Sequence, residues 1–449
     1  MKHPPLIDIS LWTLKKQGLQ NPIDLRTRIF KKYGDIACKK FFGKYNYYMG
    51  HPLYAQHVFD KNQDNYINKH ALITEVLSPF IGVNGLFTSN NIKQWDSDRL
   101  LAMASFDPKV YFKNYATDIV SLSDQTVGYW QKTFADNQTI NIATEIDKLV
   151  INIVLNTLFT HMDLINVPEL AAQIPAMTET IKAQLQYLCK PLWKISPQYH
   201  QYKDVLSYIR NLSCNIVRDR MENNKAWDDM LGNFLQQYRH LDKNEAIQYV
   251  SYHLTTFFAV GYFTTASLIH WLVVVLSLHP TVEREIQQEL DCVIGSRLPC
   301  YEDVRALPYL SSVVKETLRL HPTSFAVMRQ NNAEDEINGF YIHKNSGIIM
   351  SIYHIHRHPD FWTNPEGFDP YRFMNNPIGQ EERFAYIPFA LGKRSCIGSA
   401  FSTMEAILIM ATILQRYRIF LPSNTKIHPR ITTLVTMRPD VDMMILSRR

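Results

Sequence analysis

The run FALGKRSCIG, Phe389 to Gly398, decides the fold of this chain. Cys396 stands just before a long apolar stretch that is expected to be a helix. Unpaired backbone N–H groups and the positive end of the helix dipole favour a thiolate there. Gly392 permits a tight backbone turn, and Gly398 lets a flat ligand approach the helix without a side chain in the way. Arg394, two residues before the cysteine, is placed to meet an anionic group on the same ligand.

A flat, anionic, metal-bearing ligand that takes one axial thiolate is a haem. The run resembles the haem-binding signature Phe-x-x-Gly-x-Arg-x-Cys-x-Gly of the cytochrome P450 superfamily. Every fixed position matches, namely Phe389, Gly392, Arg394, Cys396 and Gly398. The competing interpretation is a buried cysteine in a loop before a helix, which five fixed residues in one short run disfavour. The resemblance implies haem b (iron protoporphyrin IX) with Cys396 as the axial ligand of its iron.

A second motif is Glu316-x-x-Arg319 in KETLRLHP. At i, i+3 the two side chains share a helix face, and taken alone they would be a surface ion pair that contributes little. The motif resembles the superfamily's Glu-x-x-Arg pair, because it stands upstream of Arg372 in the run Pro-Tyr-Arg-Phe. The resemblance implies a buried Glu–Arg–Arg network that fixes the coil beneath the haem.

A third motif is the pair Trp95 and Arg99, which share a helix face at i, i+4. It resembles the pair that the superfamily places against a haem propionate, and Arg329 resembles another propionate ligand. An exposed amphipathic helix explains Trp95 and Arg99 about as well. Their order along the chain, relative to the cysteine run, supports the haem interpretation.

The expected active-site helix departs from the superfamily pattern at one position. The resemblance implies that Gly261 opens this helix over the haem, and that Thr264 hydrogen-bonds dioxygen or the water that delivers its proton. Phe263 stands where the superfamily usually has an acid. Monooxygenation needs two protons, which an acid–alcohol pair normally relays. Water relayed through Thr264, Thr265 and backbone carbonyls is one hypothesis, and it gives a normal hydroxylase. The other is an already reduced oxygen donor, such as peroxide or a fatty-acid hydroperoxide, which gives a peroxygenase or a rearranging enzyme.

The resemblance implies hydroxylation or epoxidation of an apolar substrate of lipid, fatty-acid or terpenoid type by one oxygen atom of O2. Two electrons would come from a ferredoxin- or flavodoxin-type protein with its reductase. Lys393 and Arg394 are candidates for the docking surface, although a solvated basic face explains them equally. A haem protein that binds a ligand without turnover is the alternative from another class. Candidate pocket residues, which as aromatic or apolar side chains are often core instead, are Phe257, Phe258, Phe263, Phe325, Val327 and Thr433.

The 449 residues contain no Gly/Ser linker, low-complexity tract or internal repeat, so we expect one haem domain over residues 1–449. The predicted fold is mainly α with a small β-rich side, the P450 fold. Its β-rich parts are predicted near 23–50, 323–353 and 418–447. Helices are predicted from 92 to 238, at 244–278, at 281–294, from 308 and at 397–417.

Composition limits the remaining classes. A net charge of +5 over this length is too weak to indicate nucleic-acid binding. The six cysteines form no C-x-x-C pair, which indicates reduced cytosolic thiols, and five of them are expected in the core. Residues 246–282 carry no Asp, Glu, Lys or Arg, but Thr, Ser and His are spread along them, which favours a buried helix over a membrane span. The amino terminus, broken by Asp8, Lys15 and Lys16, resembles neither a signal peptide nor an anchor. We therefore expect a soluble cytoplasmic protein.

Overall fold

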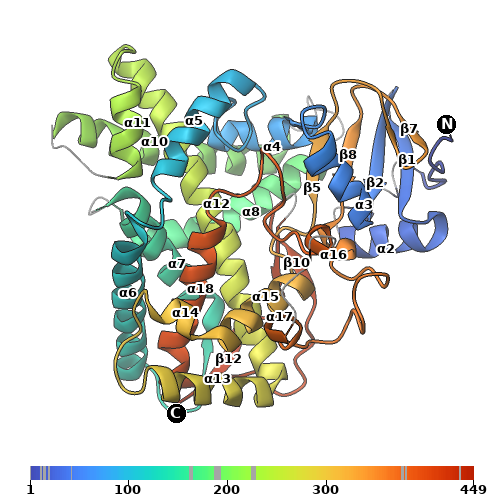
Figure 1. The fold of residues 1–449 in the computed structure, drawn as a ribbon. Helices are drawn as coiled ribbons and strands as arrows, with labels where there is room; N and C mark the ends of the chain where they lie inside the picture. The colour runs from blue at the N-terminus through green and yellow to red at the C-terminus, as the bar shows by residue number, and fades with distance from the viewer. Residues whose placement is uncertain are drawn as a thin grey trace.

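The computed structural model describes residues 2–448 except 11–12, 14–16, 19–20, 42, 161–164, 187–193, 224–228, 376–378, 380–381 and 434–435. Helices form most of the molecule, and strands gather beside the amino-terminal segment on one side (Figure 1). This confirms the predicted fold class. The predictions for Cys189, Lys15 and Lys16 lie outside the described residues.

The helices follow one another with short connections. They are α2 (Pro22–Tyr33), α3 (Pro52–Gln56), the π-helix η1 (His57–Lys61), α4 (Ala71–Ile81), α5 (Ile92–Ala104), α6 (Phe112–Thr133), α7 (Ile142–Phe159), α8 (Val167–Gln186), α10 (Pro197–Glu222), α11 (Met230–Gln237), α12 (Lys243–Leu278), α13 (Pro280–Val293), α14 (Asp303–Ala306), α15 (Pro308–Leu320), α16 (Ile352–Ile355), α17 (Arg372–Asn375), the 3-10 helix η2 (Glu382–Phe384) and α18 (Ser399–Leu414).

The largest described sheet has the strand order β1-β2-β8-β5-β3, in which only β2 and β8 pair in parallel. Three smaller sheets have the orders β4-β12-β9, β10-β11 and β6-β7. The strands are β1 (Ile36–Phe41), β2 (Lys44–Met49), β3 (Asn68–Lys69), β4 (Gln138–Asn141), β5 (Val327–Gln330), β6 (Asp335–Ile337), β7 (Phe340–Ile342), β8 (Gly347–Met350), β9 (Tyr417–Phe420), β10 (Pro429–Ile431), β11 (Met437–Pro439) and β12 (Met443–Arg448).

Helix α12 runs through the middle of the helical part (Figure 1). It begins after Asp242, whose carboxylate accepts the N–H groups of Asn244 and Glu245, and it ends where His279-Pro280 follows. By length and composition alone it is the one helix among the described residues that could cross a membrane, but 78% of its most apolar window is buried inside the protein. The predicted bounds were therefore correct to one residue, and the apolar run is a core helix.

Some local predictions were wrong. The part near 23–50 begins with α2, which Asn21 caps and Pro22 starts, so strands occupy only its second half. The short strands β3 and β4 were not predicted, because they exist only through pairing with the distant strands β5 and β12. Of the cysteines expected in the core, Cys38 is buried, whereas Cys292 and Cys300 are exposed.

Candidate active site

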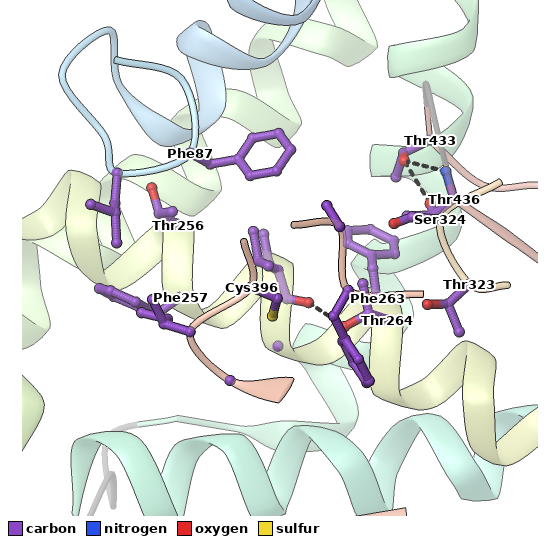
Figure 2. A pocket seen from close by; sticks show the side chains of 18 of the residues that line it. Phe87, Thr256, Phe257, Phe263, Thr264, Thr323, Ser324, Cys396, Thr433 and Thr436 are labelled. Atoms are coloured by element: carbon purple, nitrogen blue, oxygen red, sulfur yellow. Dashed lines mark hydrogen bonds between the residues drawn. The ribbon is translucent and has the colours of Figure 1, made fainter. Parts of the chain in front are cut away.

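A cavity of about 310 Å³ lies between α12 and the loop that carries Cys396. Most of its lining is apolar, and Cys396 reaches it from the loop while Phe263 and Thr264 reach it from α12 (Figure 2). The loop turns at Gly392, whose φ is +73°. A Cβ there would come within 2.2 Å of the Phe59 carbonyl oxygen, so only glycine fits. Gly392 thus shapes the loop without lining the cavity, whereas Phe389 and Gly398 line it.

The Cys396 side chain is exposed to the cavity but lies deep among protein atoms. Its backbone N–H donates to the Phe389 carbonyl at 3.0 Å, and α18 begins directly after Gly398. Burial raises the pKa of the Cys396 thiol, and the Gly398 N–H and the Arg99 charge oppose this only in part. A thiolate at this position therefore needs a cation in contact with it, as the iron of a haem would be.

Four cations line one part of the cavity, and its lining contains no Asp or Glu. Lys69 and Arg329 are paired residues on β3 and β5, Arg99 lies on α5, and Arg394 lies on the Cys396 loop. Burial, and then the charges of the three arginines, hold the pKa of Lys69 well below its usual value. Nε and Nη1 of Arg394 are buried and have no hydrogen-bond partner among the described residues. These orphaned donors and this excess of positive charge fit the two propionates of a haem.

Lys69 was missed by sequence reasoning. A single lysine before α4 carries no local signal, since its place in the site comes from the pairing of β3 with β5. Trp95 differs from its prediction in another way. Its indole N–H donates to the Leu86 carbonyl at 3.1 Å and so is not free for a propionate. Instead, its ring packs against Arg394, whose guanidinium carbon lies 3.8 Å from the ring centroid.

Gly261, Phe263 and Thr264 all line the cavity from α12. The Thr264 hydroxyl donates to the Val260 carbonyl at 2.8 Å, so toward the cavity it offers its lone pairs. A Cβ at Gly261 would lie 3.4 Å from Val154 of α7, so this glycine also lets α7 approach α12 closely.

Thr265 differs from its prediction as part of the relay beside Thr264. Its hydroxyl donates to Oε2 of Glu405 on α18 at 3.1 Å and is not directed at the cavity. Glu405 is completely buried, and burial raises its pKa to about 8, although the Thr265 hydrogen bond opposes the shift. At neutral pH most Glu405 carboxyls are therefore protonated. Sequence reasoning missed Glu405, although one acid within an apolar helix was a usable signal.

The Glu–Arg–Arg network is assembled as expected. Oε2 of Glu316 accepts from Nε of Arg319 at 2.7 Å and Oε1 accepts from Nη2 at 2.8 Å, and both side chains are fully buried. Arg372 adds a contact of 3.3 Å to Oε1 of Glu316. The remaining donors of Arg319 bind backbone carbonyls of the following coil, namely those of His356, Pro365 and Gly367.

Among the candidate pocket residues, Phe257, Phe263, Val327 and Thr433 line the cavity. Phe325 does not, because it is fully buried in a small cluster with Ile23, Ala326 and Met437. Phe258 does not line it either, since its ring stacks on that of Tyr262. Hydroxyl residues that line the cavity but were not predicted are Thr323, Ser324 and Thr436.

The proposed docking surface also changes. Lys393 is exposed, but its ammonium pairs with Asp64 at 2.5 Å. Arg394 points inward, where Nη2 donates to the Ser89 carbonyl at 2.7 Å. Of these two basic residues, only Lys393 can meet a partner protein.

A sequence model of the family described as cytochrome P450 matches residues 3–446. The chain is 27% identical to cyclooctat-9-en-7-ol 5-monooxygenase of Streptomyces melanosporofaciens, over 72% of this chain and 69% of the relative. It is 27% identical to cytokinin hydroxylase of Arabidopsis thaliana, over 82% of this chain and 73% of the relative. It is 24% identical to the chloroplastic cytochrome P450 97B2 of Glycine max, over 91% and 79%. The chain therefore belongs to the cytochrome P450 family and is a haem-containing monooxygenase.

Proposed function

We propose that the protein inserts one oxygen atom of O2 into an apolar small molecule, with Cys396 as the axial ligand of its haem. The observation that carries the proposal is one apolar cavity with a cysteine on one side and the Gly261–Thr264 segment on the other. Lys69, Arg99, Arg329 and Arg394 would hold the propionates. Haem bound there supplies the activation of oxygen.

The chain's own residues suggest how protons reach the cavity although Phe263 carries none. Glu405 is protonated at neutral pH, since its pKa is about 8. Its Oε2 contacts Thr265, which is next to Thr264 in α12. We propose that Glu405 and Thr265 supply a proton that water carries to the lone pairs of Thr264. This route supports use of O2 over use of an already reduced oxygen donor.

The proposed substrate is of lipid, fatty-acid or terpenoid type. The mostly apolar lining of the cavity supports this class. So do two relatives, which are named for oxidation of cyclooctat-9-en-7-ol and for hydroxylation of cytokinin.

The proposed electron donor is an acidic ferredoxin or flavodoxin with its reductase. The net charge of +5 and the exposed Lys393 support an acidic partner. We further propose that the protein is soluble and cytoplasmic, since 78% of the apolar window of α12 is covered by protein.

Labelled oxygen tests the proposal. Holoprotein is given a compound that displaces the water ligand of its haem, together with a ferredoxin, its reductase, NADPH and ¹⁸O₂. We expect a product that carries one ¹⁸O atom and requires the reductant. Product formed only with hydrogen peroxide, or a hydroperoxide rearranged without reductant, would overturn the proposal in favour of peroxide chemistry. No product in any arm would favour a protein that binds ligand without turnover.

A further inference from the structure

We propose that the cavity selects a substrate with one uncharged oxygen function, a hydroxyl or carbonyl group, which a patch of four hydroxyl side chains binds. The hydroxyl patch consists of Thr323, Ser324, Thr433 and Thr436, all of which line the cavity. This inference rests on the proposed function and narrows its substrate class from apolar molecules in general to neutral, singly oxygenated ones.

Two segments that are distant in sequence form the hydroxyl patch. Ser324 and Thr436 form an antiparallel backbone bridge, and the N–H of Met437 donates to the Thr323 carbonyl at 3.0 Å. The four residues lie together on one side of the cavity in Figure 2, while Phe87, Thr256 and Phe257 lie on the other. The backbone bonds hold the patch in place before a ligand arrives.

The hydroxyl patch has donors to spare. Thr436 Oγ1 lies 2.8 Å from Thr432 Oγ1 and 2.6 Å from Thr433 Oγ1. Two hydrogen bonds consume two of the three hydroxyl protons in this trio, so one O–H remains to donate. The side chains of Thr323 and Ser324 make no hydrogen bond to any residue that the structure describes. A ligand oxygen at this place therefore meets donors that nothing else in the described chain occupies.

The hydroxyls that α12 presents are already committed. Thr256 Oγ1 donates to the carbonyls of Ile81 and Tyr252. Thr264 donates to the Val260 carbonyl, and Thr265 donates to Glu405. Among the cavity's threonine and serine side chains whose bonds are described above, only those of the hydroxyl patch have protons to donate to a substrate.

The charges of the cavity favour a neutral oxygen over a carboxylate at the hydroxyl patch. The charged residues of the lining are Lys69, Arg99, Arg329 and Arg394, and the pKa of Lys69 responds to all three arginines, so they form one group. The hydroxyl patch itself contains no cation. An ionised carboxylate bound there would lose its hydration without a counter-charge, whereas a hydroxyl or carbonyl would lose little.

Matched ligands test the inference on holoprotein. Geraniol, farnesol and geranylgeraniol are compared with their saturated parent hydrocarbons and with their carboxylic acids, by isothermal titration calorimetry and by the Soret shift. We expect at least one alcohol to bind about tenfold more tightly than both its hydrocarbon and its acid, as one or two net hydrogen bonds imply. The Ser324→Ala/Thr433→Val double variant should reduce this preference to about threefold or less, while Thr256→Val, on the other side of the cavity, should keep it.

Each other outcome counts against the inference. Equal binding of alcohol and hydrocarbon would overturn it, as would tightest binding of the acids or no binding by any alcohol. A preference that persists in the double variant would also overturn it. The carbon-monoxide spectrum of each sample separates this failure from failure of the proposed function. Holoprotein with a thiolate spectrum but no preference refutes only the hydroxyl patch, whereas loss of the thiolate spectrum refutes the proposed haem ligation.

Discussion

Replacing Glu316 by glutamine should destabilise the protein strongly without changing its shape. The Glu316 carboxylate is fully buried and accepts two bonds from Arg319, one from Arg372 and one from the Asp369 N–H. Glu316→Gln leaves the Arg319 charge buried with only carbonyl partners. Loss of one member of such a set costs about 3–5 kcal/mol.

The cost converts into a melting shift. An unfolding entropy of about 2.1 cal/mol/K per residue gives about 0.9 kcal/mol/K for 449 residues. The expected fall in the unfolding midpoint is then about 3–5 °C. Circular dichroism on heating, together with urea unfolding of the same samples, measures it.

Glu179→Gln is the matched control. Glu179 and Lys182 also pair at i, i+3, with nitrogen and oxygen 2.8 Å apart, but the Glu179 side chain is 65% exposed. Its loss should cost less than about 1 kcal/mol. If Glu316→Gln melts within 1 °C of Glu179→Gln, by this order-of-magnitude argument, the buried network does not hold the coil as we infer.

Three further changes have distinct expected results. Burial raises the pKa of Glu405 to about 8, so the folded state holds an extra proton from about pH 4.5 upward and the unfolding free energy falls as pH rises toward 8; Glu405→Gln should flatten this slope, by up to about 1.4 kcal/mol per pH unit in urea titrations. Lys69→Met removes one of four mutually repelling cations, so it should stabilise haem-free protein yet speed haem loss to apomyoglobin, and unchanged haem loss would argue against Lys69 as a propionate ligand. Thr264→Ala removes the hydroxyl that faces the cavity, so more of the NADPH electrons should appear as hydrogen peroxide, and coupling equal to that of the unmodified protein would contradict its role.

Features encoded by nearby residues were predictable from the sequence. The Cys396 loop, the Glu316–Arg319 pair and the bounds of α12 each depend on spacing within one segment. Features that depend on distant pairing were not. Lys69 enters the site because β3 pairs with β5, and Thr265 turns away from the cavity because Glu405 of α18 packs against it.

The same distinction explains the errors among the aromatic residues. Trp95 was placed correctly on its helix face, but the Leu86 carbonyl that takes its N–H belongs to a preceding irregular segment. Phe325 and Val327 have similar apolar character, and only the packing of Ile23 and Met437 around Phe325 makes it core. Periodicity indicates which side chains are buried, but not whether they meet a cavity or another element.

The most direct test of the account is the spectrum of the reduced carbon-monoxide complex, because it reports the atom bound to the iron opposite the gas. For the unmodified protein we predict the strongly red-shifted Soret band of thiolate ligation, and for Cys396→Ser its loss. A Soret band at the ordinary position in freshly prepared unmodified protein would contradict the assignment of Cys396.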